Sequence, residues 1–153
     1  MKRLLILLLA IVVLMPSQAA AASSTQVNGG GRGTLDGVTP FSQFGFGVSI
    51  APGGSAQGHF TCLMAGSSVF PGFEPLMKVD GQVSSGSANH AAGTATFFGS
   101  GTLNLGPSGT MPAVFQVDVT EGGAGVGTLT LSVLNLGFFL PIETVMHGQI
   151  TIR

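Results

Sequence analysis

Apolar and polar residues alternate with a period of two in several short runs of this chain. In residues 128–133 three hydroxyl side chains alternate with three aliphatic ones, and residues 44–50 and 115–119 repeat the alternation with Phe, Val and Ile at apolar positions. Residues 146–152 follow it less strictly, with Met146 expected on the apolar face. Successive side chains of a strand point to opposite faces, so each run predicts a half-buried antiparallel strand.

Eight runs of this kind lie between turn-forming residues. They are residues 25–35, 41–50, 55–65, 76–84, 93–104, 112–120, 126–135 and 144–152. No segment after residue 22 shows the sustained apolar period near 3.6 that is typical of a helix, so no crossover helix is available to connect parallel strands. The short, even spacing therefore predicts an all-β domain of about eight antiparallel strands, either an up-and-down barrel or a sandwich.

Residues 1–22 have a different pattern. Lys2 and Arg3 precede an unbroken apolar run over residues 4–15, and small residues follow it. This order is that of a secretory signal peptide, and the apolar run is too short for a membrane-spanning helix of about 20 residues. We therefore expect residues 23–153 to be a mature domain exported to the periplasm, cell surface or medium, without stable membrane insertion.

Charge and cysteine content exclude some classes of function. After residue 22 the cationic residues are Arg32, Lys78 and Arg153, against six acidic ones. Nucleic-acid binding needs several Lys or Arg side chains to neutralise phosphates, so nucleic acid is excluded as a partner. Cys62 is the only cysteine, so an internal disulfide is excluded and an ordinary buried thiol is expected.

Short motifs along the mature part carry a resemblance. In order they are Asn28-Gly29-Gly30-Gly31, Phe44-Gly45-Phe46, Gly58-His59-Phe60, Thr94-Ala95-Thr96-Phe97, Gly99-Ser100-Gly101-Thr102, Val117-Asp118-Val119-Thr120 and Gly148-Gln149-Ile150-Thr151-Ile152. This series resembles a group of uncharacterised secreted bacterial β-domain proteins, although the apolar region 63–77 departs from it. The resemblance implies an exported bacterial β-domain and supplies no catalytic residue, because the group has no established activity.

Known catalytic and cofactor motifs are absent from the sequence. It contains no G-x-S-x-G elbow, P-loop, H-E-x-x-H, C-x-x-C or EF-hand loop. We therefore expect no catalytic, cofactor-binding or metal-binding residue and no cofactor. A non-enzymatic protein is favoured, and an enzyme with an unrecognised site remains an alternative.

The histidines and acidic residues are the remaining candidates for chemistry. Alternation places His59 and His147 on the polar faces of their strands. A zinc site would need both to converge with Asp80 or Asp118, whereas solvated histidines are the simpler expectation. Lys78 and Asp80 share a strand face and are expected to form a solvated pair.

Two apolar segments, residues 63–77 and 134–142, overlap the ends of predicted strands and fill the connections that follow them. They can cover the ends of the core, or they can rim a small hydrophobic pocket or a partner surface. The rim candidates are Phe70, Phe73, Phe138 and Phe139. The sequence thus favours an exported structural or binding module, with a small barrel that binds an apolar ligand at a Phe-rich mouth as the alternative.

Overall fold

The computed structural model describes residues 23–64 and 76–153, and its regular structure is almost entirely β. The strands are β1 (Thr25–Thr34), β2 (Pro40–Ile50), β3 (Ser55–Met64), β4 (Met77–Asn89), β5 (Thr94–Asn104), β6 (Thr110–Thr120), β7 (Thr128–Val133), β8 (Phe138–Phe139) and β9 (Glu143–Ile152). Two short 3-10 helices lie between strands: η1 (Gly106–Ser108) connects β5 to β6, and η2 (Leu134–Leu136) connects β7 to β8. The prediction of an antiparallel all-β fold is confirmed.

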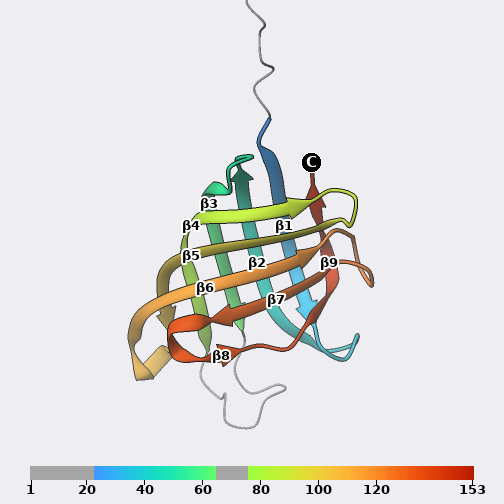
Figure 1. Cartoon of the computed structure of the whole chain (residues 1–153). Helices are drawn as coiled ribbons and strands as arrows, with labels where there is room; N and C mark the ends of the chain where they lie inside the picture. Colours follow the sequence, from blue (N-terminus) through green and yellow to red (C-terminus); the bar gives the residue numbers. More distant parts are fainter. Residues whose placement is uncertain (1–22, 65–75) are drawn as a thin grey trace, which may run out of the picture.

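Eight of these strands close into a barrel (Figure 1). Each strand from β1 to β6 pairs antiparallel with the next, β6 pairs with β7, β7 with β9, and β9 with β1. The two-residue strand β8 is extra and pairs with the end of β7. Closure removes the exposed edges that an open sheet would present, and it decides between the two predicted architectures in favour of the barrel.

The first and last strands of the barrel are neighbours. The Gln26 N–H donates to the Arg153 carbonyl at 2.6 Å, and the Arg153 N–H donates to the Gln26 carbonyl at 2.9 Å. Figure 1 shows the C-terminus at the upper end of the barrel and β8 at the lower end. The start of β1 and the end of β9 therefore lie together, away from β8.

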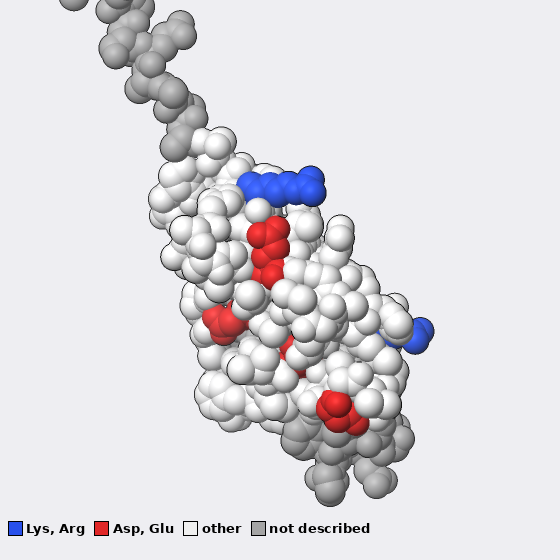
Figure 2. Space-filling model, turned by 90° about the vertical axis from the view of Figure 1, so that its right-hand side faces the viewer, with Lys and Arg blue, Asp and Glu red and all other residues white. Residues whose placement is uncertain are grey.

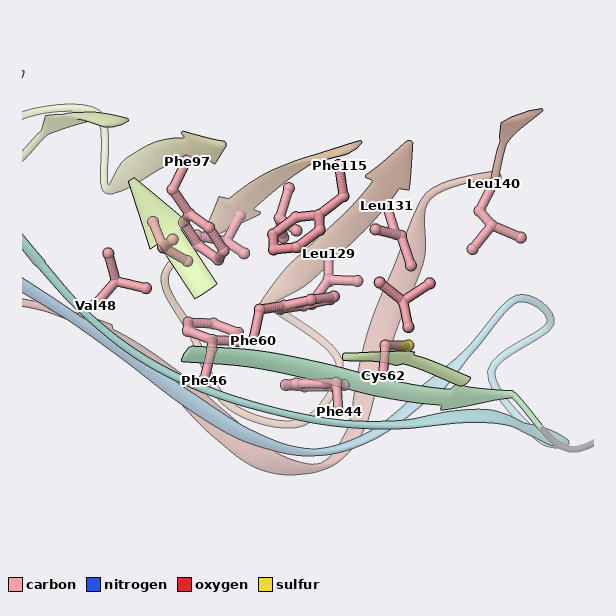
Figure 3. Close-up of a cluster of buried hydrophobic side chains, with 14 of the residues drawn as sticks. Phe44, Phe46, Val48, Phe60, Cys62, Phe97, Phe115, Leu129, Leu131 and Leu140 are labelled. Atoms are coloured by element: carbon pink, nitrogen blue, oxygen red, sulfur yellow. The ribbon is translucent and has the colours of Figure 1, made fainter. Parts of the chain in front are cut away.

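Phenylalanine rings fill the barrel interior (Figure 3). The ring centroids of Phe46 and Phe97 are 5.3 Å apart, and those of Phe60 and Phe115 are 5.4 Å apart. Aromatic rings at such separations attract one another in addition to the free energy gained by burial. Phe60, Phe97 and Phe115 are fully buried, so the central layer of the barrel is a packed core.

Glycines on the inner faces of the strands make room for these rings. A Cβ atom added to Gly81 of β4 would lie 2.8 Å from Cε1 of Phe115, and one added to Gly99 of β5 would lie 2.8 Å from Cε2 of the same ring. A Cβ atom added to Gly29 of β1 would likewise collide with the ring of Phe46. A real side chain would collide there, so the glycines and the large aromatic rings are complementary in volume.

The face of the molecule shown in Figure 2 carries few charged side chains. Asp118 of β6 accepts hydrogen bonds from Thr96 at 2.6 Å and from Gln116 at 2.8 Å. On β4 the Lys78 ammonium lies 2.9 Å from the Asp80 carboxylate, as predicted for a solvated pair. Most apolar strand residues therefore face inward, with Phe98 of β5 and Val114 of β6 as exposed exceptions. Within the described ranges, the structure contains no helix with the length and apolar character needed to cross a membrane.

The expected alternation in β9 is wrong at Met146. The pairing with β1 shifts between Arg32, which opposes His147, and Gly33, which opposes Val145, so Met146 is left out of the ladder. Such a bulge reverses which residues face the core on either side of it. Val145 is buried and Met146 is only partly buried, and the same shift turns Glu143 into the barrel.

Strand β4 is longer than predicted and strand β7 is shorter. Residues 84–89 are mostly Ser, Gly and Asn and show no apolar alternation, but after a register shift they pair with β5. Strand β7 ends early because the chain turns through η2 directly after Val133. Pairing with a neighbouring strand, rather than the local pattern, determines both of these boundaries.

Candidate functional site

The segment 134–142 closes one end of the barrel, which we call the β8 end. The Leu140 N–H donates to the Leu131 carbonyl at 3.0 Å, and Leu140 is buried. Figure 3 shows Leu140 beyond Leu131 and Cys62, at the end of the row of buried side chains. Because β8 has only two residues, a short stretch of backbone pairing and the Leu140 side chain hold this cover in place.

The same segment also presents apolar side chains to solvent. Phe139 is 68% exposed and Ile142 is 65% exposed, and Leu134 and Leu136 are exposed as well. Phe138 is partly buried and packs against the core. Several exposed apolar residues on one short segment are typical of a surface that contacts a ligand or a partner.

The four predicted rim residues have different positions. Phe138 and Phe139 both belong to β8, and the structure places only Phe139 largely in solvent. Phe70 and Phe73 lie outside the described residues. The β8 end is therefore the part of the predicted rim that the structure describes.

A buried polar cluster lies on the inner side of this end. Glu143, the first residue of β9, is 1% exposed and its Oε2 accepts a hydrogen bond from the Ser42 hydroxyl. A Cβ atom on Gly33 would lie 2.9 Å from Oγ of Ser42 and would collide with the carboxyl of Glu143. The absence of a side chain at Gly33 thus provides the space that the carboxyl occupies.

The other carboxyl oxygen of Glu143, Oε1, has no hydrogen-bond partner among the residues that the structure describes, although this atom is buried. The ion pairs found among those residues, His59 with Asp80 and Lys78 with Asp80, lie on the outer face. Buried polar atoms are normally hydrogen-bonded, so an unpartnered carboxyl oxygen is a feature that needs an explanation.

Burial changes the acidity of the groups in this cluster. Burial raises the pKa of Glu143 from 4.5 to about 7, and the hydrogen bond from Ser42 opposes that change. Burial also raises the pKa of the Cys62 thiol, and the negative charge of Glu143 raises it further. Removal from water disfavours the charged form of both groups, so the thiol is unreactive while the barrel is closed.

The histidines lie apart from this cluster. His59 is exposed on β3, where its ring lies 3.3 Å from the Asp80 carboxylate and 3.1 Å from the Gln82 amide. His147 is exposed on β9, with β1 and β2 between it and β3. In the described ranges no three His, Cys, Asp or Glu side chains gather closely enough to hold a metal ion.

The arrangement of these groups favours binding over catalysis. Ser42 and Cys62 are nucleophile types, and the Glu143 carboxyl that accepts from Ser42 is a base type, but all three groups are buried. Nucleophilic catalysis needs a base within hydrogen-bond reach of the nucleophile and access for the substrate. What the cluster can do as it stands is accept a hydrogen bond from a polar group that enters the β8 end.

Glu143 and Ser42 were not identified from the sequence. Ser42 is an ordinary residue type inside a predicted strand, and Glu143 lies just before the predicted strand 144–152, whose expected phase placed Met146 on the apolar face. An acidic residue beside the apolar segment 134–142 was the available signal, but its burial depends on the bulge.

Comparison with known proteins adds no relative: no protein-family model matches the chain, and neither the curated proteins nor the solved structures contain a match.

Proposed function

We propose that this protein is an exported, non-enzymatic barrel that binds a small apolar ligand at its β8 end. The observation that carries the proposal is the group of exposed apolar side chains on the segment that closes the barrel, above all Phe139 and Ile142. Apolar surface of this kind gains free energy when an apolar molecule covers it. The signal-peptide pattern of residues 1–22 supports export.

The packed core limits where a ligand can bind. Because the Phe rings of the central layer fill the barrel, the ligand lies at an end and not in the middle. The outward-facing polar residues support a barrel surrounded by water, since a membrane barrel has an apolar outer band. A purely structural module is the second candidate, and the filled interior is the observation that favours it.

Titration with a lipophilic fluorescent dye tests the proposal on the exported protein. We expect saturable binding that Phe139→Ser weakens at least fivefold, because the substitution removes most of the exposed apolar area at β8. Val126→Ser is the matched control, since Val126 is 66% exposed on the β6–β7 loop, at the far end of β7 from β8. Native mass spectrometry of the same protein detects a retained ligand.

Two results would contradict this proposal. Without saturable dye binding and without a retained ligand, the structural module becomes the better interpretation. Equal weakening by Phe139→Ser and Val126→Ser would show that the dye binds exposed apolar residues without preference for the β8 end.

A further inference from the structure

The unpartnered oxygen of Glu143 and the short cover of the barrel lie at the same end. Oε1 is buried on the inner side of the β8 end, and the part of the cover nearest the core consists of Leu140 and the two-residue strand β8. Binding sites for small molecules are mostly apolar, with a few polar groups that fix the orientation of the ligand. Figure 3 shows the buried side chains of Leu131, Leu140 and Cys62 toward this end of the barrel. Glu143, whose charge acts on Cys62, supplies the polar group.

We infer that Glu143 is the polar anchor of this site, and that the ligand is an amphipathic primary amine whose ammonium group donates a hydrogen bond to Oε1 while its apolar chain takes the place of Leu140. This inference rests on the proposed function, because it assigns the ligand class of the same β8 end.

The charge of the surroundings favours an amine over other head groups. A carboxylate in an apolar interior is strongly destabilised unless a cation pairs with it. Within the described part of the chain Glu143 forms no ion pair, and its Oε2 is already occupied by the Ser42 hydroxyl. An ammonium group supplies both the missing charge and the missing donor. A ligand carboxylate would instead meet a group of like charge.

The cover can be displaced at modest cost. The Leu140 N–H donates to the Leu131 carbonyl, β8 pairs with Ser132 and Val133, and Phe138 packs against the core. The Asn135 side chain holds the start of the segment, through hydrogen bonds with the Val114 N–H and the Pro112 carbonyl, so the part to be displaced is the shorter stretch around Leu140. Phe139 and Ile142 already face solvent on the same segment, so they can contact the ligand chain when it replaces Leu140. The eight-stranded barrel itself does not have to open.

A matched series of eight-carbon ligands tests the head group. Octylamine is protonated at neutral pH, as a lysine side chain is; 1-octanol is a neutral donor, and octanoate is an anion. Calorimetric titration of the exported protein gives the three affinities, first for the unchanged chain and then for Glu143→Gln, which keeps the side-chain shape and removes the charge. Circular dichroism checks that the variant is folded.

We expect octylamine to bind at least tenfold more tightly than octanoate, and 1-octanol to lie between them. Glu143→Gln should reduce the affinity for octylamine at least tenfold and that for 1-octanol less than threefold, because only the amine uses the negative charge. Phe139→Ser should weaken all three ligands alike.

Three results would overturn the inference. Equal affinities of the three ligands would show that Glu143 does not select the head group, while the apolar site of the proposed function would still stand. Tighter binding of 1-octanol than of octylamine would overturn the assignment to an amine. If none of the three ligands binds, both the inference and the proposed function fail. The comparison of head groups on the unchanged chain remains decisive even if Glu143→Gln does not fold.

Discussion

The Glu143 carboxyl lies among apolar side chains, and this position links its ionisation to folding. Its pKa is raised from 4.5 to about 7 by burial, whereas in the unfolded chain it has the ordinary value. The folded state thus holds the proton more tightly than the unfolded state. Below about pH 4.5 Glu143 is protonated in both states, so its burial does not lower the free energy of unfolding. As the pH rises toward 7, Glu143 ionises in the unfolded state but not in the folded state, and this stabilises the unfolded state.

We predict that this group makes the protein less stable as the pH rises from 4.5 to 7. The loss of unfolding free energy attributable to Glu143 is about 3 kcal/mol, the equivalent of the pKa change. Urea unfolding across this pH range should show that Glu143→Gln removes the loss. Asp36 and Asp80 have lowered pKa values and act in the opposite sense at lower pH, so the difference between the two proteins is the quantity to compare. Parallel pH profiles for both proteins would contradict the prediction.

A second prediction concerns the space left by glycine. Gly81→Ala should destabilise the barrel by about 1–3 kcal/mol, because the new methyl group meets the Phe115 ring and the Ser100 carbonyl in a packed core. Gly45→Ala is the matched control, since a Cβ atom there would lie 3.7 Å from Thr61 Cγ2, an ordinary contact. Chemical denaturation should show the control to be neutral or slightly stabilising. Equal losses for both variants would mean that Gly81 acts through the backbone alone.

Strand β8 has the shortest ladder among the strands that the structure describes. Its two residues pair with β7, and Leu140 and the partly buried Phe138 supply its contacts with the core. Elements with few buried contacts and few hydrogen bonds open locally at lower free energy than a barrel core does. Local opening of this element would expose Cys62, which is completely buried when the end is closed.

The rate of thiol labelling at Cys62 measures this opening. Leu140→Ala should increase the labelling rate at least tenfold under native conditions, equivalent to about 1.4 kcal/mol of local stability, because the variant loses the apolar contact that holds the cover. Leu136→Ala removes the same atoms from an exposed position of the same segment and should leave the rate unchanged. If labelling in both variants follows global unfolding instead, the cover does not open independently.

Strand positions were predictable from the sequence because the inner and outer faces of the barrel differ so clearly. Residues 128–133 and 115–119 show strict alternation, and the structure buries their apolar members. The bulge in β9 was not predictable, because it arises from the pairing of Gly31 and Arg32 with Gly148 and His147. The site depends on that bulge, so the position of Glu143 could be known only from the structure.

The closure of the strands into a barrel was also not predictable from the sequence. A barrel and a sandwich have the same alternation along each strand, and the difference lies in which strands pair at the end of the series. Here the pairing of β6 with β7, of β7 with β9 and of β9 with β1 completes the circle. The Phe residues that fill it were visible as apolar positions, but their meeting in one layer depends on glycines in other strands.

The pairing of β1 with β9 means that the position of the chain ends along the circle of strands is arbitrary. Neighbouring strands lie about 5 Å apart, so a short Gly-Ser linker can join Ser24 to Arg153. New ends cut within the exposed η1 turn should then give a circular permutant with the same barrel. We expect its circular dichroism spectrum and its dye affinity to match those of the parent. The same barrel of strands would then form from more than one order of the strands along the chain.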